Sequence, residues 1–252
     1  MVRDFAGQVV VVTGAGHGIG RAIAGAFAAR GARVWACDIL ADALAETKAV
    51  IPEGLETSTF DVRDGTAVQG FIDRILEREG RIDVLVNNAG GVQGQVGQAL
   101  ETVSTEAWRA IFEVNLDAAF YFSRAVAPTM KRARYGRMVT VSSGAGLGVS
   151  LTGIQAYASA KAAQVGLTRQ LAHELGPWNI TVNAVAPGFV LSNPATKRQW
   201  DAYGDEGQRR LVEGIALRRL GTPEDVANGV LFFASPLASW VTGETLRIDG
   251  GR

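Results

Sequence analysis

The stretch Val9-Val-Val-Val-Thr-Gly-Ala-Gly-His-Gly-Ile-Gly20 decides how the rest of the chain is organised. Four consecutive valines predict a fully buried parallel strand, and the glycines that follow predict a sharp turn into a helix. Such a turn suits a phosphate, because glycine lets the backbone approach closely and the first N–H groups of the helix point at an anion. The spacing is Thr-Gly-x-x-x-Gly-x-Gly, since Ile19 fills the last glycine position of the common G-x-G-x-x-G fingerprint. Taken alone, the motif also fits a tight connection that binds nothing.

Composition predicts an ordinary globular protein. The chain has 252 residues, 47% apolar and 20% charged, which favours a single domain over residues 1–252. Its 25 basic and 25 acidic residues cancel, which argues against nucleic acid or an anionic membrane as a partner. One cysteine, Cys37, and two histidines leave too few ligands for a disulfide or a metal cluster of these residues. With no signal-peptide pattern and no apolar run near 18 residues, we expect a soluble, cytoplasmic protein.

Strand and helix patterns alternate along the whole chain. Predicted strands follow the first one at residues 33–38, 56–61, 82–86, 137–141, 180–185 and 245–248. Helical patterns occupy residues 19–30, 64–79, 104–134 and 155–175, and begin again near residues 41 and 222. This alternation predicts an α/β fold, a doubly wound parallel sheet of about seven strands with helices on both faces. Ligands of such sheets bind at the carboxyl ends of the strands.

Asp38 closes the second predicted strand, about 20 residues after the glycines. An acidic side chain at this place accepts hydrogen bonds from the adenosine ribose and repels a 2′-phosphate. Asp38 could instead cap the helix that starts near Ala41. The glycines upstream favour the ribose role, and therefore NAD over NADP as the cofactor.

Tyr157 and Lys161 stand one helical turn apart on the same face of the helix predicted at 155–175. A lysine ammonium close to a phenol lowers the pKa of the phenol from about 10 toward the range of a general acid or base. A packed tyrosine beside a solvated lysine has the same spacing. Asn115, inside the predicted helix 104–134, either bonds neighbouring backbone or serves chemistry nearby.

Several motifs in order make the chain resemble the classical short-chain dehydrogenase/reductase family over essentially all of its length. They are Thr13-Gly14-x-x-x-Gly18-x-Gly20, Asp61, Asn87-Asn88-Ala89-Gly90, Asn115, Ser143, Tyr157-x-x-x-Lys161 and Pro187-Gly188. The resemblance implies a Rossmann-like fold and hydride transfer between a nicotinamide cofactor and a secondary alcohol or carbonyl. It also implies a homo-oligomer, a tetramer or a dimer.

The resemblance also implies a role for each residue of a catalytic set. Tyr157 would be the acid/base and Ser143 would bind the substrate oxygen. Lys161 would hold the nicotinamide ribose and lower the pKa of Tyr157, and Asn115 would anchor a water that joins Lys161 to solvent. The implied cofactor-binding residues are Gly14, His17, Gly18, Ile19, Gly20, Asp38, Asp61, Val62, Asn88, Ala89, Gly90, Tyr157, Lys161, Pro187, Gly188, Val190 and Ser192.

The chain departs from the family pattern at three places. One residue more than usual separates Ser143 from Tyr157, so either the loop 144–156 carries an insertion or Ser142 and Ser143 exchange roles. Ser192 stands where many members have threonine, which keeps a hydroxyl. His17 stands where many NADP-using members carry arginine, which supports NAD.

Residues 189–220 resemble the variable substrate lid of the family and carry many polar side chains. The candidate substrate contacts are Ser143, Gln155, Tyr157, Asn193, Arg198 and Trp200. They favour a small polar substrate such as a sugar, a sugar acid or a polyol. The alternative is an NADPH-dependent 3-oxoacyl thioester reductase. A nucleotide-binding regulatory protein without turnover is an alternative of another class, against which the complete proton-transfer set speaks.

Overall fold

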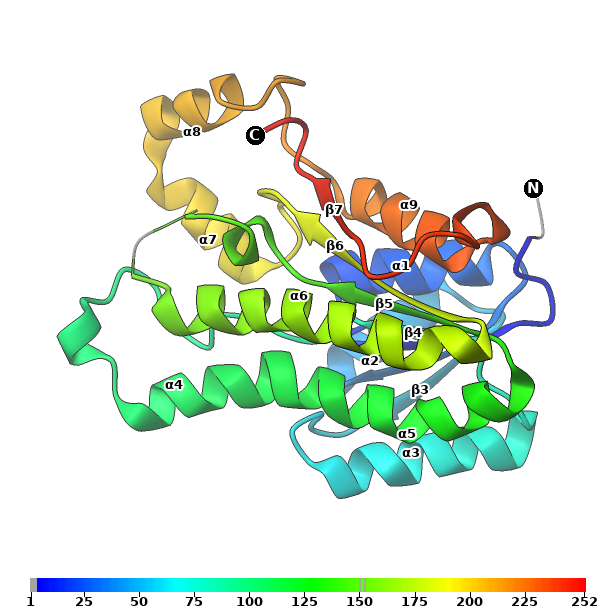
Figure 1. Ribbon diagram of the computed structural model, residues 1–252. Coiled ribbons are helices and arrows are strands. Elements are labelled where there is room, and N and C mark those ends of the chain that lie inside the picture. Colours follow the sequence, from blue (N-terminus) through cyan, green and yellow to red (C-terminus); the bar gives the residue numbers. More distant parts are fainter. Residues whose placement is uncertain (1–3, 150, 152) are drawn as a thin grey trace.

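A seven-stranded sheet forms the centre of the protein in the computed structural model, which describes residues 4–149, 151 and 153–252 (Figure 1). The strands are β1 (Val9–Thr13), β2 (Arg33–Asp38), β3 (Leu55–Thr59), β4 (Val84–Asn87), β5 (Gly136–Val141), β6 (Ile180–Pro187) and β7 (Thr245–Ile248). Their order is β3-β2-β1-β4-β5-β6-β7, and every neighbouring pair is parallel. The predicted doubly wound, Rossmann-like sheet is therefore confirmed. The strand order reverses between β1 and β4, where such folds bind ligands.

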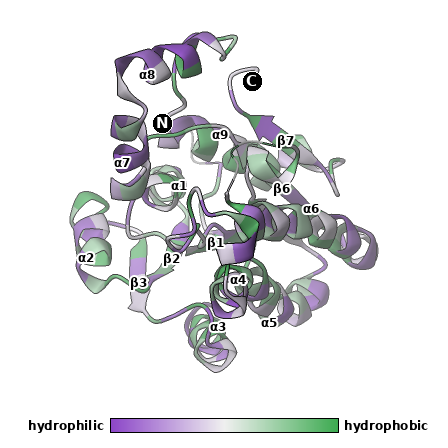
Figure 2. Cartoon of the chain, turned by 90° about the vertical axis from the view of Figure 1, so that its left-hand side faces the viewer, coloured by the Kyte–Doolittle hydropathy of each residue, from purple (hydrophilic) through white to green (hydrophobic). Residues whose placement is uncertain are grey.

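Helices cover both faces of the sheet (Figure 2). They are α1 (Gly18–Ala28), α2 (Ala41–Val50), α3 (Gly65–Glu79), α4 (Thr105–Phe112), α5 (Ala118–Ala133), α6 (Gln155–Leu175), α7 (Pro194–Ala202), α8 (Gly204–Glu213) and α9 (Pro223–Ala234). One hydrophobic core joins α1, α2 and α9 to the sheet, and a second joins α3, α5 and α6 to the opposite face. No helix within the described ranges combines the length and the apolar composition needed to span a bilayer.

The run of valines in β1 serves both cores. Val10 and Val12 pack in the core beneath α1 and α9, whereas Val9 and Val11 pack in the core beneath α3 and α5. All four are at most 2% exposed. Successive side chains of a strand point to opposite faces, so a strand covered on both sides must be apolar throughout.

Two predicted elements differ from the observed ones. The third strand ends at Thr59 instead of residue 61, because the chain turns there: Asp64 N–H donates to the Asp61 carbonyl, and the Asp64 side chain caps α3. The long helix predicted at 104–134 is interrupted by a π-helical turn, Glu113–Asp117, between α4 and α5. Asn115 Nδ2 donates to the Ile111 carbonyl at 2.8 Å and so competes for an acceptor that the α-helical backbone would use.

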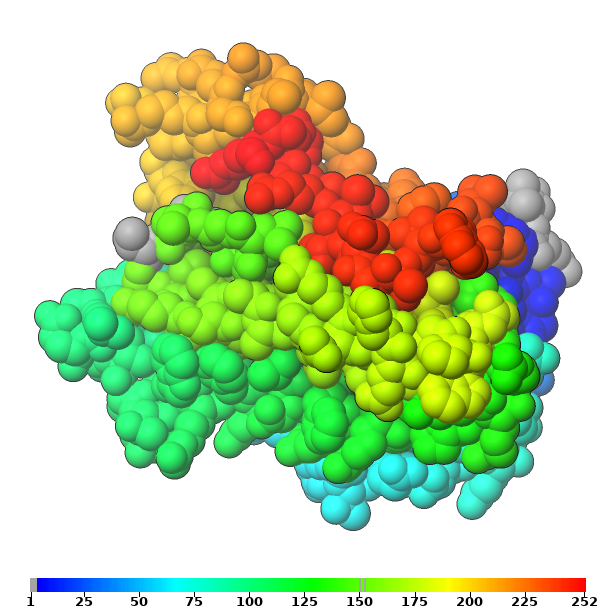
Figure 3. Space-filling view, in the orientation of Figure 1, coloured from blue at the N-terminus to red at the C-terminus, as the bar shows by residue number. Residues whose placement is uncertain are grey.

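Helices α7 and α8 stand above the left-hand end of the sheet in Figure 1 and overhang the body of the protein in the space-filling view (Figure 3). Most residues of α7 and α8 are hydrophilic (Figure 2). Asn193 and Thr196 form a capping box that starts α7. Phe189 contacts the rings of Trp200 and Tyr203, with centroids 6.1 and 5.9 Å away, and this aromatic cluster ties the segment down.

Candidate functional site

Ser143, Tyr157 and Lys161 meet at the carboxyl end of β5. Ser143 follows β5 directly, whereas Tyr157 and Lys161 lie in the first two turns of α6. Burial raises the pKa of Tyr157, and a hydrogen bond from Ser143 to the Tyr157 hydroxyl partly opposes that shift. Ser142 is buried and donates instead to the Lys161 backbone carbonyl at 2.9 Å. The geometry thus pairs Ser143, and not Ser142, with Tyr157.

The extra residue between Ser143 and Tyr157 is absorbed by contact with the loop that follows β4. Gly153 has φ +73°, and a Cβ on it would lie 2.5 Å from Gly97 Cα. Gln155 Nε2 donates to the Gln98 carbonyl at 3.0 Å, and Ala156 N–H donates to Gln95 Oε1 at 3.2 Å. The longer loop therefore packs against the loop after β4, and Tyr157 remains beside Ser143.

Lys161 is buried, with 3% of its surface exposed, and Nζ donates to the Val141 carbonyl at 2.9 Å. Burial lowers the pKa of Lys161 from 10.5 to about 7. Burial also raises the pKa of Tyr157, although Ser143 opposes that shift. The pKa of Tyr157 is thus shifted upward, opposite to the lowering expected beside Lys161, because desolvation penalises the charged form of both groups.

The Asn115 side chain forms hydrogen bonds with neighbouring backbone, which is one of the two roles considered for it from the sequence. Its Nδ2 donates to the Gly91 carbonyl at 2.9 Å, and its Oδ1 accepts from Gly91 N–H at 3.1 Å. This pair of bonds fixes the loop after β4 to the π-helical turn. A methyl group on Gly90 would collide with Asn115 Oδ1 and lie 3.4 Å from Lys161 Nζ, so Asn115 and Lys161 face one another across Gly90.

The glycine turn after β1 packs against two other segments of the site. Gly14 has φ +67°, and a Cβ on it would lie 2.8 Å from Ala89 Cα. Gly18 has φ +52°, and a Cβ there would collide with the Ser192 carbonyl. Thr13 Oγ1 accepts hydrogen bonds from the N–H groups of Asn88 and Ala89 at 3.0 and 2.9 Å. The turn, the Asn-Asn-Ala-Gly loop and the chain at Ser192 are thus in direct contact.

A dinucleotide fits this cradle chemically. Helix α1 starts at Gly18 without a side-chain cap from His17, and its first turn carries no acidic residue. The first N–H groups of the helix and its dipole are therefore available to a pyrophosphate. Ile19 and Gly20 belong to the same turn, and a Cβ on Gly20 would collide with the Gly14 carbonyl.

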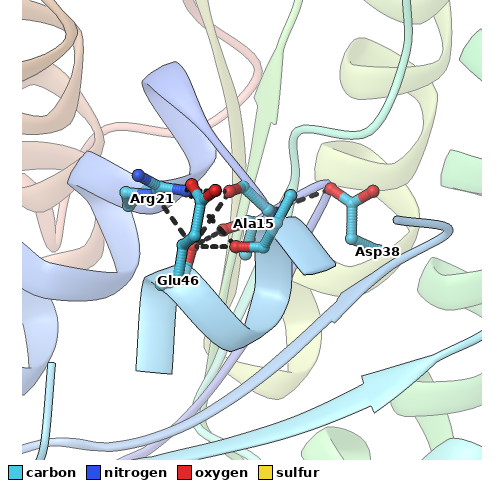
Figure 4. A network of polar contacts seen from close by, with 7 residues as sticks. Ala15, Arg21, Asp38 and Glu46 are labelled. Carbon is cyan, nitrogen blue, oxygen red and sulfur yellow. Dashed lines mark hydrogen bonds and ion pairs between the residues drawn. The ribbon is translucent and has the colours of Figure 1, made fainter. Parts of the chain in front are cut away.

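Asp38 binds the glycine turn rather than capping α2. Its Oδ2 accepts from Gly16 N–H at 2.8 Å and its Oδ1 from Leu40 N–H at 3.0 Å, while the N-cap of α2 is Leu40. Arg21 approaches the same turn from the other side, donating to the Gly16 carbonyl at 2.6 Å and pairing with Glu46 at 3.0 Å (Figure 4).

Sequence reasoning missed this second half of the network. Thr47, which is 0% exposed, places its hydroxyl 2.9 Å from the Ala15 carbonyl and 3.0 Å from that of Gly16. The signal in the sequence was a threonine on the alanine-rich helix that follows Asp38.

The remaining predicted cofactor residues also lie at the carboxyl ends of strands. Arg63 binds the Asp61 carboxylate at 2.6 Å and holds the pKa of Asp61 below its usual range, while the adjacent Val62 is buried.

Pro187 ends β6, and Gly188 N–H donates to the Ile248 carbonyl at 2.9 Å. Val190 is 5% exposed and forms an isolated bridge with Gly221. Ser192 N–H donates to Thr196 Oγ1 at 3.0 Å.

The predicted polar substrate contacts are largely committed to the fold. Asn193 caps α7, Trp200 packs on Phe189, and Arg198 is exposed. Gln155 borders a hollow that is also lined by Leu100, Val103, Ser104, Thr105 and Trp108. Large apolar side chains are exposed on the loops around the strand ends: Val96, Leu100, Val149, Leu151 and Leu191. The rim of the site is therefore more apolar than the sequence suggested.

No group of three or more His, Cys, Asp or Glu side chains is arranged as metal ligands in the part of the chain that the structure describes.

The family model described as enoyl-(acyl carrier protein) reductase matches residues 14–252 of the chain. The 3-oxoacyl-(acyl-carrier-protein) reductase FabG of Escherichia coli (strain K12) is 36% identical over 252 residues, which cover 98% of each chain. The 2,3-dihydro-2,3-dihydroxybenzoate dehydrogenase of Bacillus subtilis (strain 168) is 37% identical, with 99% of this chain and 97% of the relative covered. Among solved structures, a 7α-hydroxysteroid dehydrogenase complexed with NADH and 7-oxo glycochenodeoxycholic acid has a TM-score of 0.90 and 35% identity, covering 99% of this chain and 95% of its own.

Proposed function

The chain belongs to the short-chain dehydrogenase/reductase family and is an oxidoreductase acting on CH–OH groups, and we propose that it uses NAD(H) to interconvert a ketone and a secondary alcohol. The observation that carries this proposal is the convergence of Ser143, Tyr157 and Lys161 at the end of β5, opposite the glycine turn.

In the proposed mechanism each residue has one task. The nicotinamide, when bound, donates or accepts the hydride. Tyr157 donates a proton to the developing alkoxide during reduction and takes it back during oxidation, since its hydroxyl stays protonated at neutral pH in a buried setting. Ser143 donates a hydrogen bond to the same substrate oxygen and orients it. Lys161 holds the nicotinamide ribose, and Asn115 keeps the loop at Gly91 in place.

Asp38 supports NAD over NADP. Both of its oxygens accept backbone N–H groups, which keeps a negative charge beside the glycine turn where the adenosine ribose would lie. A 2′-phosphate in the same place would meet that charge. One structural relative, the 7α-hydroxysteroid dehydrogenase, was solved with NADH bound, which supports NADH as a cofactor to test.

A 3-oxoacyl thioester is the first substrate candidate. The FabG relatives favour it over the sugar or polyol first expected from the lid, and the exposed Val96, Leu100, Leu151 and Leu191 around the strand ends suit an acyl chain better than a polyol. A secondary alcohol on a ring is the second candidate, because relatives named for a hydroxysteroid and for a dihydro-dihydroxybenzoate are about equally similar.

We further propose a homo-oligomer in the cytoplasm. Trp240 and Leu237 are 98% and 83% exposed, and Phe232 and Leu246 lie nearby on α9 and β7. An apolar surface of this kind is typical of an interface between copies of a chain. On α6, Ala156 and Ala160 pack against Ile111 of α4 within the chain, whereas Ala162 is exposed.

The decisive experiment is an assay of an acetoacetyl thioester, a steroid ketone, cyclic ketones and sugar acids, each with NADH and with NADPH. We expect turnover with NADH and the thioester, and none in Tyr157→Phe. Turnover of sugar acids alone would favour the small polar substrate expected from the sequence. Cofactor binding without turnover of any of these compounds, in either direction, would favour a binding protein.

A further inference from the structure

Gln164 is a buried amide that no role above uses. It follows Lys161 by three residues on α6, so the two side chains share one face of the helix. Gln164 is 1% exposed, and its Nε2 donates to the Asn115 backbone carbonyl at 2.6 Å. Its Oε1 is buried and has no hydrogen-bond partner among the residues that the structure describes.

The bond from Gln164 reaches a backbone carbonyl inside the π-helical turn Glu113–Asp117. A wider turn takes backbone carbonyls out of their usual i→i+4 pairing. Asn115 is 0% exposed, so its carbonyl depends on hydrogen-bond donors from the protein. Gln164 supplies one such hydrogen bond from a different helix and thereby holds the turn.

The contacts then lead back to Lys161. Asn115 exchanges two hydrogen bonds with Gly91, and the adjacent Gly90 lies between Asn115 Oδ1 and Lys161 Nζ. Gln164 holds the π turn, and the π turn holds the loop at Gly90 and Gly91. This loop and Asn115 face Lys161, which lies one turn before Gln164 on α6.

We propose that Gln164 is a positioning residue of the catalytic set, which fixes Asn115 through its amide nitrogen and offers its free amide oxygen to the surroundings of Lys161. The inference rests on the proposed function for its catalytic meaning. Gln164 Oε1 can accept a hydrogen bond from a water molecule or from the Lys161 ammonium.

Few other charges act on Lys161. The ring of Tyr157, on the same helix, has its centroid 5.6 Å from Lys161 Nζ. Burial is the cause of the low Lys161 pKa, and no charged side chain from the described parts of α4, α5, β5, β6 or the π turn contributes to it. A new charge at position 164 would therefore act on Lys161 without competition.

Two substitutions test the proposal in opposite directions. Gln164→Met keeps the size and removes both polar atoms, so the pKa of Lys161 should fall further. Gln164→Glu places a carboxylate at the same distance, so the pKa of Lys161 should rise by about one unit or more. Both values are read from the ε-¹³C resonance of Lys161 in labelled protein, assigned by its loss in Lys161→Met. In the assay, kcat of Gln164→Met should fall about tenfold while KM changes little.

Thr168→Val is the matched control. Thr168 is 2% exposed on the same face of α6, and its hydroxyl donates to the Gln164 carbonyl at 2.9 Å. This variant should lose stability but keep the Lys161 pKa and kcat. A Lys161 resonance that titrates as in the wild type in both Gln164 variants would overturn the proposal, and if Gln164→Met does not fold, Gln164→Glu decides alone. Shifted Lys161 titrations in a protein without turnover would refute the proposed function and leave the positioning intact.

Discussion

Lys161 Nζ donates its hydrogen bond to the Val141 carbonyl and not to the Tyr157 hydroxyl. This contact joins the first turns of α6 to the end of β5. Burial of the ammonium lowers the pKa of Lys161 to about 7. In this arrangement Lys161 makes its hydrogen bond to backbone and not to the phenol, which agrees with the proposed role of Lys161 in holding the cofactor ribose.

Stability should depend on pH through Lys161. The pKa of Lys161 is about 7 in the folded protein and 10.5 in a free lysine. Between these values the unfolded chain binds more protons, so the free energy of unfolding rises with pH. Compared with Lys161→Met, the wild type should gain stability from pH 7 to pH 10, by at most on the order of 4 kcal/mol. Urea unfolding at both pH values measures it, with the exposed Lys48→Met as control; parallel pH curves for wild type and Lys161→Met would contradict it.

Tyr157→Phe should bind NADH as the wild type does and lose turnover by a factor of about 10²–10⁴. The ring packing is kept and only the proton-carrying hydroxyl is removed. Stopped-flow turnover and fluorescence titration of NADH separate the two effects. Wild-type rates in this variant would eliminate Tyr157 as the acid/base.

Asp38→Asn should weaken the preference for NADH over NADPH by about 10- to 100-fold, because the charge that opposes a 2′-phosphate is removed while an acceptor for Gly16 N–H remains. Dissociation constants for both cofactors check this. Asp42→Asn, in the exposed first turn of α2, is the control. Tighter binding of NADPH by the wild type would overturn the NAD assignment.

Gly153→Ala should disturb the contact between the loop before α6 and the loop after β4. The left-handed φ of +73° and the 2.5 Å approach to Gly97 Cα leave no room for a methyl group. We expect a loss of roughly 2 kcal/mol or more in stability, with reduced kcat because Tyr157 follows four residues later. Gly148→Ala, which has nothing within 4 Å, should change neither. Equal behaviour of the two variants in thermal unfolding and turnover would show that the contact has no such role.

Trp240→Glu should reduce the oligomer to a smaller species. A charge placed in an apolar interface loses its hydration there. Light scattering coupled to size exclusion measures the mass, and Val50→Glu, at a site that is 65% exposed on α2, is the control. An unchanged mass would remove the surface around Trp240 from consideration as the interface.

The sequence by itself determined the sheet and the order of its motifs. Val9–Thr13 must be covered on both faces, and strand–helix alternation leaves few topologies, so β1, the strand ends near Asp38 and Ser143 and the helix that carries Tyr157 could be placed from local patterns. Strand burial and strand–helix alternation depend on short stretches of chain, so the periodicity of apolar residues is enough to predict them.

Only the tertiary structure decided what these side chains do to one another. The choice between Ser142 and Ser143, the partner of Asp38 and the direction of the Tyr157 pKa depend on burial and on contacts between segments far apart in the chain. Gln164 and Asn115 are 49 residues apart, and no local pattern joins them. Desolvation is a property of the assembled core, so the sequence could place the candidate catalytic residues but could not give the direction in which their pKa values shift.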